Sequence, residues 1–160
     1  MSQTNEHLVR AHELWHKLKT DPFSGSESPQ AIITLLLREL GNGGQNPAYL
    51  DRDPAGNPRR NRDEMEREIY RAGMAAEVKK ANSLANPWVR RAELSDFGSE
   101  ALLATYIADR LEFAYRFAQK VDKSVRPPGT LLRRRGDITM EELVPLCDAA
   151  KKLQLLLKKV

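Results

Sequence analysis

The segment His12-Glu13-Leu14-Trp15-His16 holds residue types whose spacing could do chemistry. In an H-E-x-x-H sequence, two imidazoles lie one helical turn apart and can share a metal ion, while the carboxylate beside them can act as a general base. This chemistry needs a helix, and the flanking residues predict one from about residue 5 to about residue 19. Its apolar stripe recurs at steps of three and four: Leu8, Ala11, Trp15 and Leu18.

The pentapeptide resembles the motif of zinc metalloproteases, which implies a metal-dependent hydrolase with His12 and His16 as ligands and Glu13 as base. Only 11 residues precede it, too few for the sheet on which those enzymes bind substrate. The remaining histidine, His7, lies about 140° round the helix from His12. Arg10 and His16 also resemble the R-x(4–6)-H motif of HEPN ribonucleases, another all-helical family. We favour surface histidines, predict no metal site, and keep a small helical nuclease or metal-dependent hydrolase as an alternative.

The single cysteine, Cys147, lies on the apolar stripe of a predicted C-terminal helix. A reactive thiolate needs a cationic and partly exposed setting, and no histidine in the last 144 residues could serve as its base. We therefore predict a buried structural cysteine. Since the chain also lacks a G-x-x-x-x-G-K-[ST] phosphate loop and a G-x-S-x-G nucleophile turn, we predict no catalytic residue and no cofactor.

Arginine clusters give the other chemical signal. Nine of the 26 Lys and Arg residues lie in the last 38 positions, where the net charge is +5 against +4 for the whole chain. Arginine attracts phosphate through charge and bidentate geometry, so the clusters predict nucleic-acid contacts, with Tyr49 and Trp88 as possible stacking partners for bases. The predicted nucleic-acid-binding residues lie in two loops: Arg59, Arg60, Arg62, Arg126, Arg133, Arg134 and Arg135.

The elements that must position these residues are helices. Apolar residues recur with helical spacing in five segments, and no segment alternates apolar and polar residues as a strand would. Capping signals mark helix starts at Ser28-Pro29, Asn61, Ser95 or Ser99, and Thr139. Glycine, proline and asparagine fill residues 41–62, and a second loop covers 123–137. We predict an all-α fold, an irregular bundle of about five helices in a single domain, 1–160.

Composition narrows the class of protein further. With 41% apolar and 30% charged residues, the chain fits neither a disordered segment nor a membrane protein. The lack of a secretory signal and the single cysteine predict a cytoplasmic location. We interpret the chain as a non-enzymatic helical subunit or accessory factor that binds DNA or RNA through its arginine loops. The alternative from another class is a protein-interaction or adaptor domain that binds an acidic partner, within a larger complex and without membrane contact.

Overall fold

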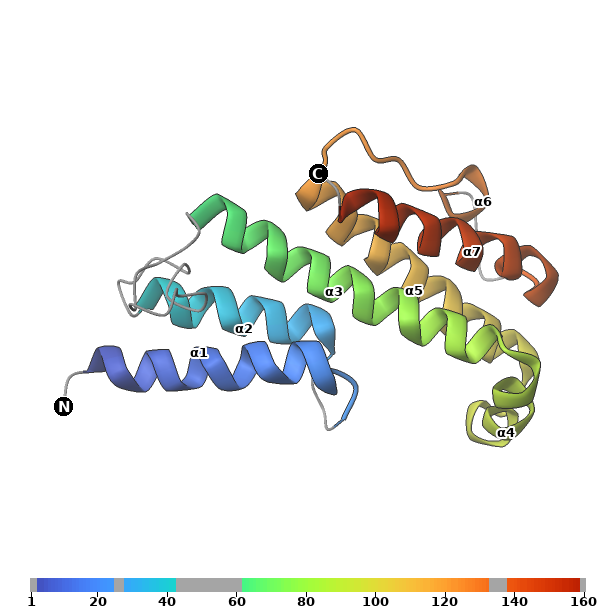
Figure 1. Cartoon of the computed structure of the whole chain (residues 1–160). Coiled ribbons are helices and arrows are strands. Elements are labelled where there is room, and N and C mark those ends of the chain that lie inside the picture. Colours follow the sequence, from blue (N-terminus) through green and yellow to red (C-terminus); the bar gives the residue numbers. More distant parts are fainter. Residues whose placement is uncertain (1–2, 25–27, 43–61, 133–137, 159–160) are drawn as a thin grey trace. The chain divides into compact units, whose positions relative to one another are not determined.

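A computed structural model describes residues 3–24, 28–42, 62–132 and 138–158. These residues form helices and no strand, which confirms the predicted all-α fold (Figure 1). The helices in this described part are α1 (Gln3–Thr20), α2 (Pro29–Asn42), α3 (Arg62–Ala85), α4 (Pro87–Phe97), α5 (Glu100–Val121), α6 (Gly129–Leu132) and α7 (Met140–Leu157). None of them is long and apolar enough to cross a membrane.

The chain divides into two compact units, Met1–Gly73 and Met74–Val160. Helix α3 contributes residues to both units, and the single domain predicted for 1–160 stays a prediction. In the first unit, α1 packs against α2. Their contact is apolar, as helical packing requires. The buried side chains are Ala11, Leu14 and Leu18 of α1 and Ile32, Ile33 and Leu36 of α2.

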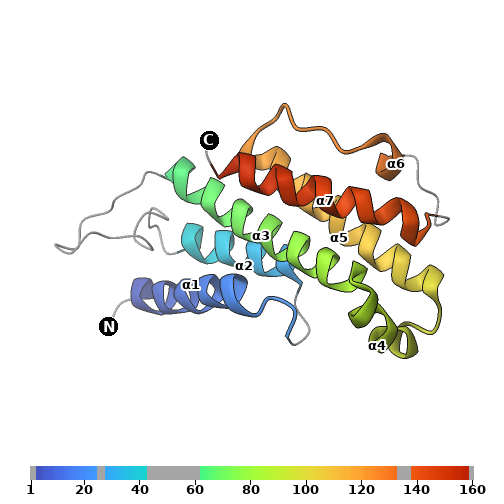
Figure 2. The ribbon, with the colours of Figure 1, turned by 45° about the vertical axis from the view of Figure 1, so that its right-hand side comes forward.

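The second unit contains the α5–α7 pair, which lies side by side and runs in the same direction (Figures 1 and 2). The chain after α5 therefore returns along the pair before α7 begins. Ser99 caps α5 by accepting a hydrogen bond from the Leu102 amide at 3.2 Å. Thr139 and Glu142 form the predicted capping box of α7. The predicted apolar stripe of α5 is buried at every position: Leu103, Ile107, Leu111, Ala114, Ala118 and Val121.

Several predicted boundaries were wrong. Helix α2 continues through Gly41 to Asn42, inside the loop predicted for 41–62, whereas α3 starts at Arg62, as the capping signal at Asn61 predicted. Positions 43–61 lie outside the described residues. The predicted loop 123–137 contains the short helix α6. Asn86-Pro87-Trp88 predicts a short turn through Leu94, and the structure extends it to helix α4, which ends at Phe97. Neither α4 nor α6 has the long apolar stripe on which the prediction relied.

Helical spacing predicts a buried stripe on α3: Met65, Ile69, Ala72, Gly73 and Ala76. Ile69 and Gly73 are buried as predicted, whereas Ala72 and Ala76 are only half-buried, and the Met65 side chain lies outside the described part. The face continues beyond the predicted stripe with Met74, Glu77, Val78, Ala81 and Leu84. The carboxylic acid Glu77 has no exposed surface at all.

Candidate functional site

Most of the predicted arginine site lies outside the described residues: Arg59, Arg60, Arg133, Arg134 and Arg135. Arg62 is the first residue of α3. Arg126 is exposed in the segment that follows α5. The structure therefore gives the surroundings of one predicted nucleic-acid-binding side chain, and the geometry around it can be built from the end of α5.

The segment after α5 is tied back to the helix by hydrogen bonds. The Asp122 amide donates to the Ala118 carbonyl at 2.9 Å, and the side-chain amide of Gln119 donates to the Val125 carbonyl at 3.1 Å. The Arg126 guanidinium closes the turn, because its Nη1 donates to the Lys123 carbonyl at 2.7 Å and to the Val125 carbonyl at 3.0 Å. These bonds hold the cations of the segment next to the helix end and reduce the entropy lost on binding.

Four exposed cations follow one another through this region, and we call them the basic strip: Arg116, Lys120, Lys123 and Arg126. Arg116 and Lys120 lie one turn apart on α5, on the face opposite the buried Ala114 and Ala118. The guanidinium carbon of Arg116 lies 5.3 Å from the centroid of the Phe113 ring. None of the four pairs with a carboxylate among the residues that the structure describes.

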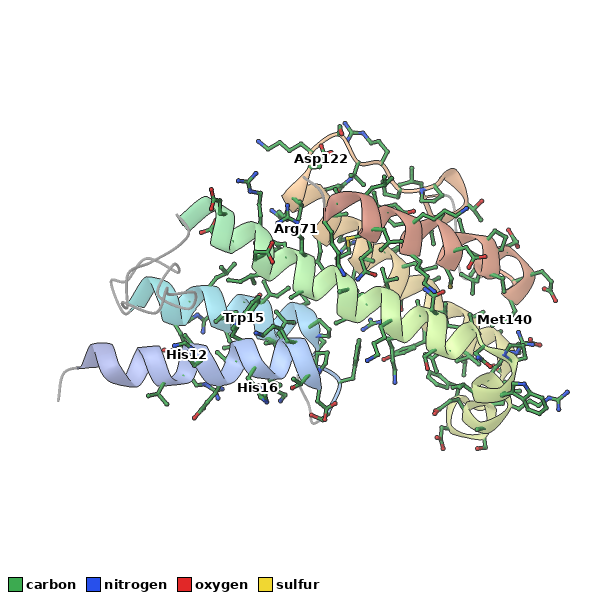
Figure 3. All side chains as sticks on the ribbon, viewed as in Figure 1. His12, Trp15, His16, Arg71, Asp122 and Met140 are labelled. Atoms are coloured by element: carbon green, nitrogen blue, oxygen red, sulfur yellow. The ribbon has the colours of Figure 1, made fainter. Side chains whose placement is uncertain are left out.

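Asp122 is the one acid within residues 116–126, and its carboxylate is engaged in the turn that follows α5. Its carboxylate accepts hydrogen bonds from the Ser124 amide at 3.0 Å and the Ser124 hydroxyl at 2.7 Å (Figure 3). These two bonds lower the pKa of Asp122. The carboxylate thus caps the turn instead of neutralising Lys123, and residues 116–126 keep a net charge of +3 from four cations and one acid.

The two ends of the α5–α7 pair differ in charge. Because both helices run in the same direction, their N-termini lie together, and Glu100 and Glu141 stand in the first turns there. The other end of the pair holds the basic strip and Lys158, the C-cap residue of α7. Figure 3 places Met140 and Asp122 at these opposite ends. Acids at helix N-termini and bases at C-termini complement the helix dipoles, and they also concentrate positive charge at one end.

The N-terminus of α7 is unsuited to phosphate, although the arginine run precedes it in the sequence. The Thr139 hydroxyl accepts a hydrogen bond from the Glu142 amide at 3.3 Å, and the Glu142 carboxylate accepts one from the Thr139 amide at 3.2 Å. Glu141 adds a second negative charge in the same turn. The protein itself therefore supplies the groups that an anion would otherwise provide.

The H-E-x-x-H segment lies on α1, where Figure 3 labels His12, Trp15 and His16. His12, Glu13 and His16 are exposed, and a Glu13 carboxylate oxygen lies 3.6 Å from Nη1 of Arg10. Trp15 is half-buried, with the Lys19 ammonium 4.7 Å from its ring centroid. Within the described ranges, no three His, Cys, Asp or Glu side chains gather closely enough to hold a metal ion.

Cys147 is buried, as predicted for a structural thiol. Burial, with a smaller effect from the nearby Asp148 charge, raises the pKa of the thiol to about 11. Its backbone carbonyl accepts a hydrogen bond from the side-chain amide of Asn82 at 3.3 Å, which joins α7 to α3. The cysteine is therefore a packing residue whose thiol stays protonated at neutral pH.

An ion pair is buried inside the second unit. Nε of Arg110 lies 3.4 Å from Oε2 of Glu77, and the Arg110 guanidinium carbon lies 4.7 Å from the Tyr106 ring centroid. In the described part of the chain, neither Glu77 carboxylate oxygen accepts a hydrogen bond. Burial raises the pKa of Glu77 to about 7 despite the attraction of Arg110. This pair bears on stability, because it is closed to solvent.

Three of the four cations of the basic strip were not among the predicted contacts: Arg116, Lys120 and Lys123. The signal for Arg116 and Lys120 is their spacing of four opposite an apolar stripe, and the signal for Lys123 is its place directly after the helix end. Comparison of the chain with models of known protein families, with curated proteins and with solved structures gave no match.

Proposed function

We propose that the chain is a non-enzymatic helical module that binds nucleic acid through the phosphate backbone, with the basic strip as its contact surface. The observation that carries this proposal is a set of four exposed cations without carboxylate partners in the described residues. Unpaired cations are available to replace the counterions of a polyanion, which is the main source of non-specific affinity for nucleic acids.

The arrangement of the turn supports the same proposal. The hydrogen bonds of Gln119 and Arg126 fix the segment after α5 before any ligand arrives, and Ser124 occupies the Asp122 carboxylate. Arg133, Arg134 and Arg135 stay predicted contacts. A basic surface held in place in this way binds phosphates with little ordering cost.

The test is direct binding of a fluorescent oligonucleotide at low salt. Non-specific binding of this kind has dissociation constants of roughly 10⁻⁴ to 10⁻⁶ M at physiological salt and tightens as salt is removed. We expect the double variant Lys120→Gln/Lys123→Gln to weaken binding severalfold. The matched control, Arg38→Gln/Lys79→Gln, removes the same charge from exposed positions outside the strip. Equal effects of the two double variants, or no binding at low salt, would contradict the proposal.

A protein partner with an acidic surface is the competing result. It would show as a protein that copurifies with the wild type and is lost with Lys120→Gln/Lys123→Gln, while oligonucleotides fail to bind. In that case the basic strip would still be a binding site, but its ligand would be an acidic protein instead of nucleic acid.

A further inference from the structure

Helix α4 presents one large aromatic side chain to solvent. Trp88 is 79% exposed, although tryptophan is usually well buried, and α4 has no buried residue. On a helical wheel Trp88 shares its face with Arg91, Ala92 and Ser95, all of them exposed. We call these four residues the Trp88 shelf. Small side chains beside the indole leave its ring accessible.

The shelf is held in a fixed position from both ends of α4. Asn86 caps the helix by accepting a hydrogen bond from the Trp88 amide at 3.0 Å, and Pro87 fixes the first turn. At the other end Gly98 adopts a left-handed conformation, and its amide donates to the Leu94 carbonyl at 2.9 Å. The ring of Phe97 lies 5.1 Å from that of Tyr106 on α5. Trp88 is therefore exposed on a helix that is anchored to the second unit.

The charge next to Trp88 is positive. The Arg91 guanidinium carbon lies 5.7 Å from the centroid of the Trp88 ring. Arg90, the residue before it, is a second cation and is half-buried. The first turn of α4 holds no acid. Trp88 is the large apolar side chain that α4 exposes, so an apolar protein partner would find only one indole to pack against on this helix. A nucleobase requires one aromatic surface and a cation for its phosphate, which the shelf supplies.

We infer that the Trp88 shelf is a stacking platform for a base of single-stranded nucleic acid, with Arg91 contacting the neighbouring phosphate. The inference rests on the proposed function and narrows its ligand from nucleic acid in general to single strands. Stacking needs an unpaired base, because a duplex keeps its base faces covered. Affinity for single strands should therefore depend on Trp88, and affinity for duplex should not.

The length of α5 sets the size of the ligand. Its 22 residues span about 33 Å, with the basic strip at its C-terminal end and α4 at its N-terminal end (Figures 1 and 2). A stacked strand advances about 3.4 Å for each nucleotide, so roughly ten nucleotides cover that distance. A strand of that length is long enough to reach from the strip to α4, and contact with both sites would raise its affinity through their linkage.

The experiment measures binding of oligo(dT) of about 20 nucleotides, longer than a typical single-strand site, and of a duplex of the same length. The variant Trp88→Ala should weaken single-strand binding roughly 5- to 150-fold and leave duplex binding unchanged. Trp88→Phe, which keeps an aromatic ring, should restore much of the loss. In a Trp15→Phe background, Trp88 is the one tryptophan left, and its fluorescence should be quenched by oligo(dT).

The possible failures are distinguishable. Binding of oligo(dT) that depends on Lys120 and Lys123 but is unaffected by Trp88→Ala would overturn the shelf and leave the proposed function standing. Equal weakening of single-strand and duplex binding by Trp88→Ala would also overturn it. Failure of every oligonucleotide to bind at low salt would remove both proposals. Circular dichroism of Trp88→Ala checks the fold, which should persist because Trp88 is exposed.

Discussion

The buried pair of Glu77 and Arg110 leads to a quantitative prediction about stability and pH. Replacing Glu77 with glutamine keeps the size of the side chain and removes its ionisation. Since Glu77 has no exposed surface, this substitution isolates the free energy of placing a carboxylate in the interior beside Arg110. The pair lies within the second unit, so its effect belongs to the unfolding of Met74–Val160.

The magnitude follows from the pKa. Burial raises the pKa of Glu77 from 4.5 to about 7, and each pKa unit corresponds to about 1.4 kcal/mol. The folded state therefore binds a proton that the unfolded state releases between these two values. The stability from this proton is fully present below about pH 4.5 and is lost as the pH rises through about 7. Glu77 should lower the free energy of unfolding by roughly 3 kcal/mol across that window.

The assay is urea unfolding followed by circular dichroism between about pH 4.5 and about pH 8, for the wild type and Glu77→Gln. Subtracting the two curves removes the titration of all other groups. We expect the wild type to lose roughly 3 kcal/mol relative to Glu77→Gln as the pH rises. Glu141→Gln, which removes a carboxylate from an exposed position, is the matched control.

Two results would refute this reasoning. A pH-independent difference between the wild type and Glu77→Gln would mean that Glu77 is in contact with water. A wild type that gains stability relative to Glu77→Gln as the pH rises would mean that the attraction of Arg110 exceeds the cost of burial.

Two further predictions concern helix ends. Thr139→Ala should lower the free energy of unfolding by about 1 kcal/mol, because it removes the hydroxyl of the capping box, whereas Thr139→Ser should retain most of the stability. Urea unfolding of the pair checks this, and equal losses would show that the hydroxyl does not cap α7. Gly98→Ala should cost about 1 kcal/mol through its positive φ of 81° alone, since an added Cβ meets no atom within 4 Å. Thermal unfolding of Gly98→Ala and Gly98→Asn checks this: asparagine tolerates the left-handed region, so a larger loss for asparagine would contradict the account.

Features that are set by residues close together in the sequence, such as helix caps and apolar stripes, were predicted correctly. The capping box at Thr139 and the buried stripe of α5 are both written within a few turns of sequence, and the structure confirms both. The end of α2 was predicted wrongly because Gly41 was taken as the end of the helix, whereas the helix continues to Asn42. Helix ends depend on hydrogen bonds that composition alone does not specify.

Features that depend on distant residues were not predictable in this way. Glu77 lies beside Arg110, 33 positions later, and no local pattern predicts that pairing. The basic strip was hidden for another reason. The predicted charge cluster begins at Lys123, the first of the last 38 positions, so Arg116 and Lys120 on the preceding helix fell outside it.

The central claim is that the basic strip binds nucleic-acid phosphates, and the salt dependence of oligonucleotide affinity tests it most directly. Each phosphate contact contributes about 0.7 to the slope of log K against log salt for single strands and about 0.9 for duplex. The account predicts that Lys120→Gln/Lys123→Gln lowers the magnitude of that slope by about 1.4 with single strands and about 1.8 with duplex. It also predicts that Arg38→Gln/Lys79→Gln leaves the slope unchanged. An equal slope for the wild type and Lys120→Gln/Lys123→Gln would contradict the claim.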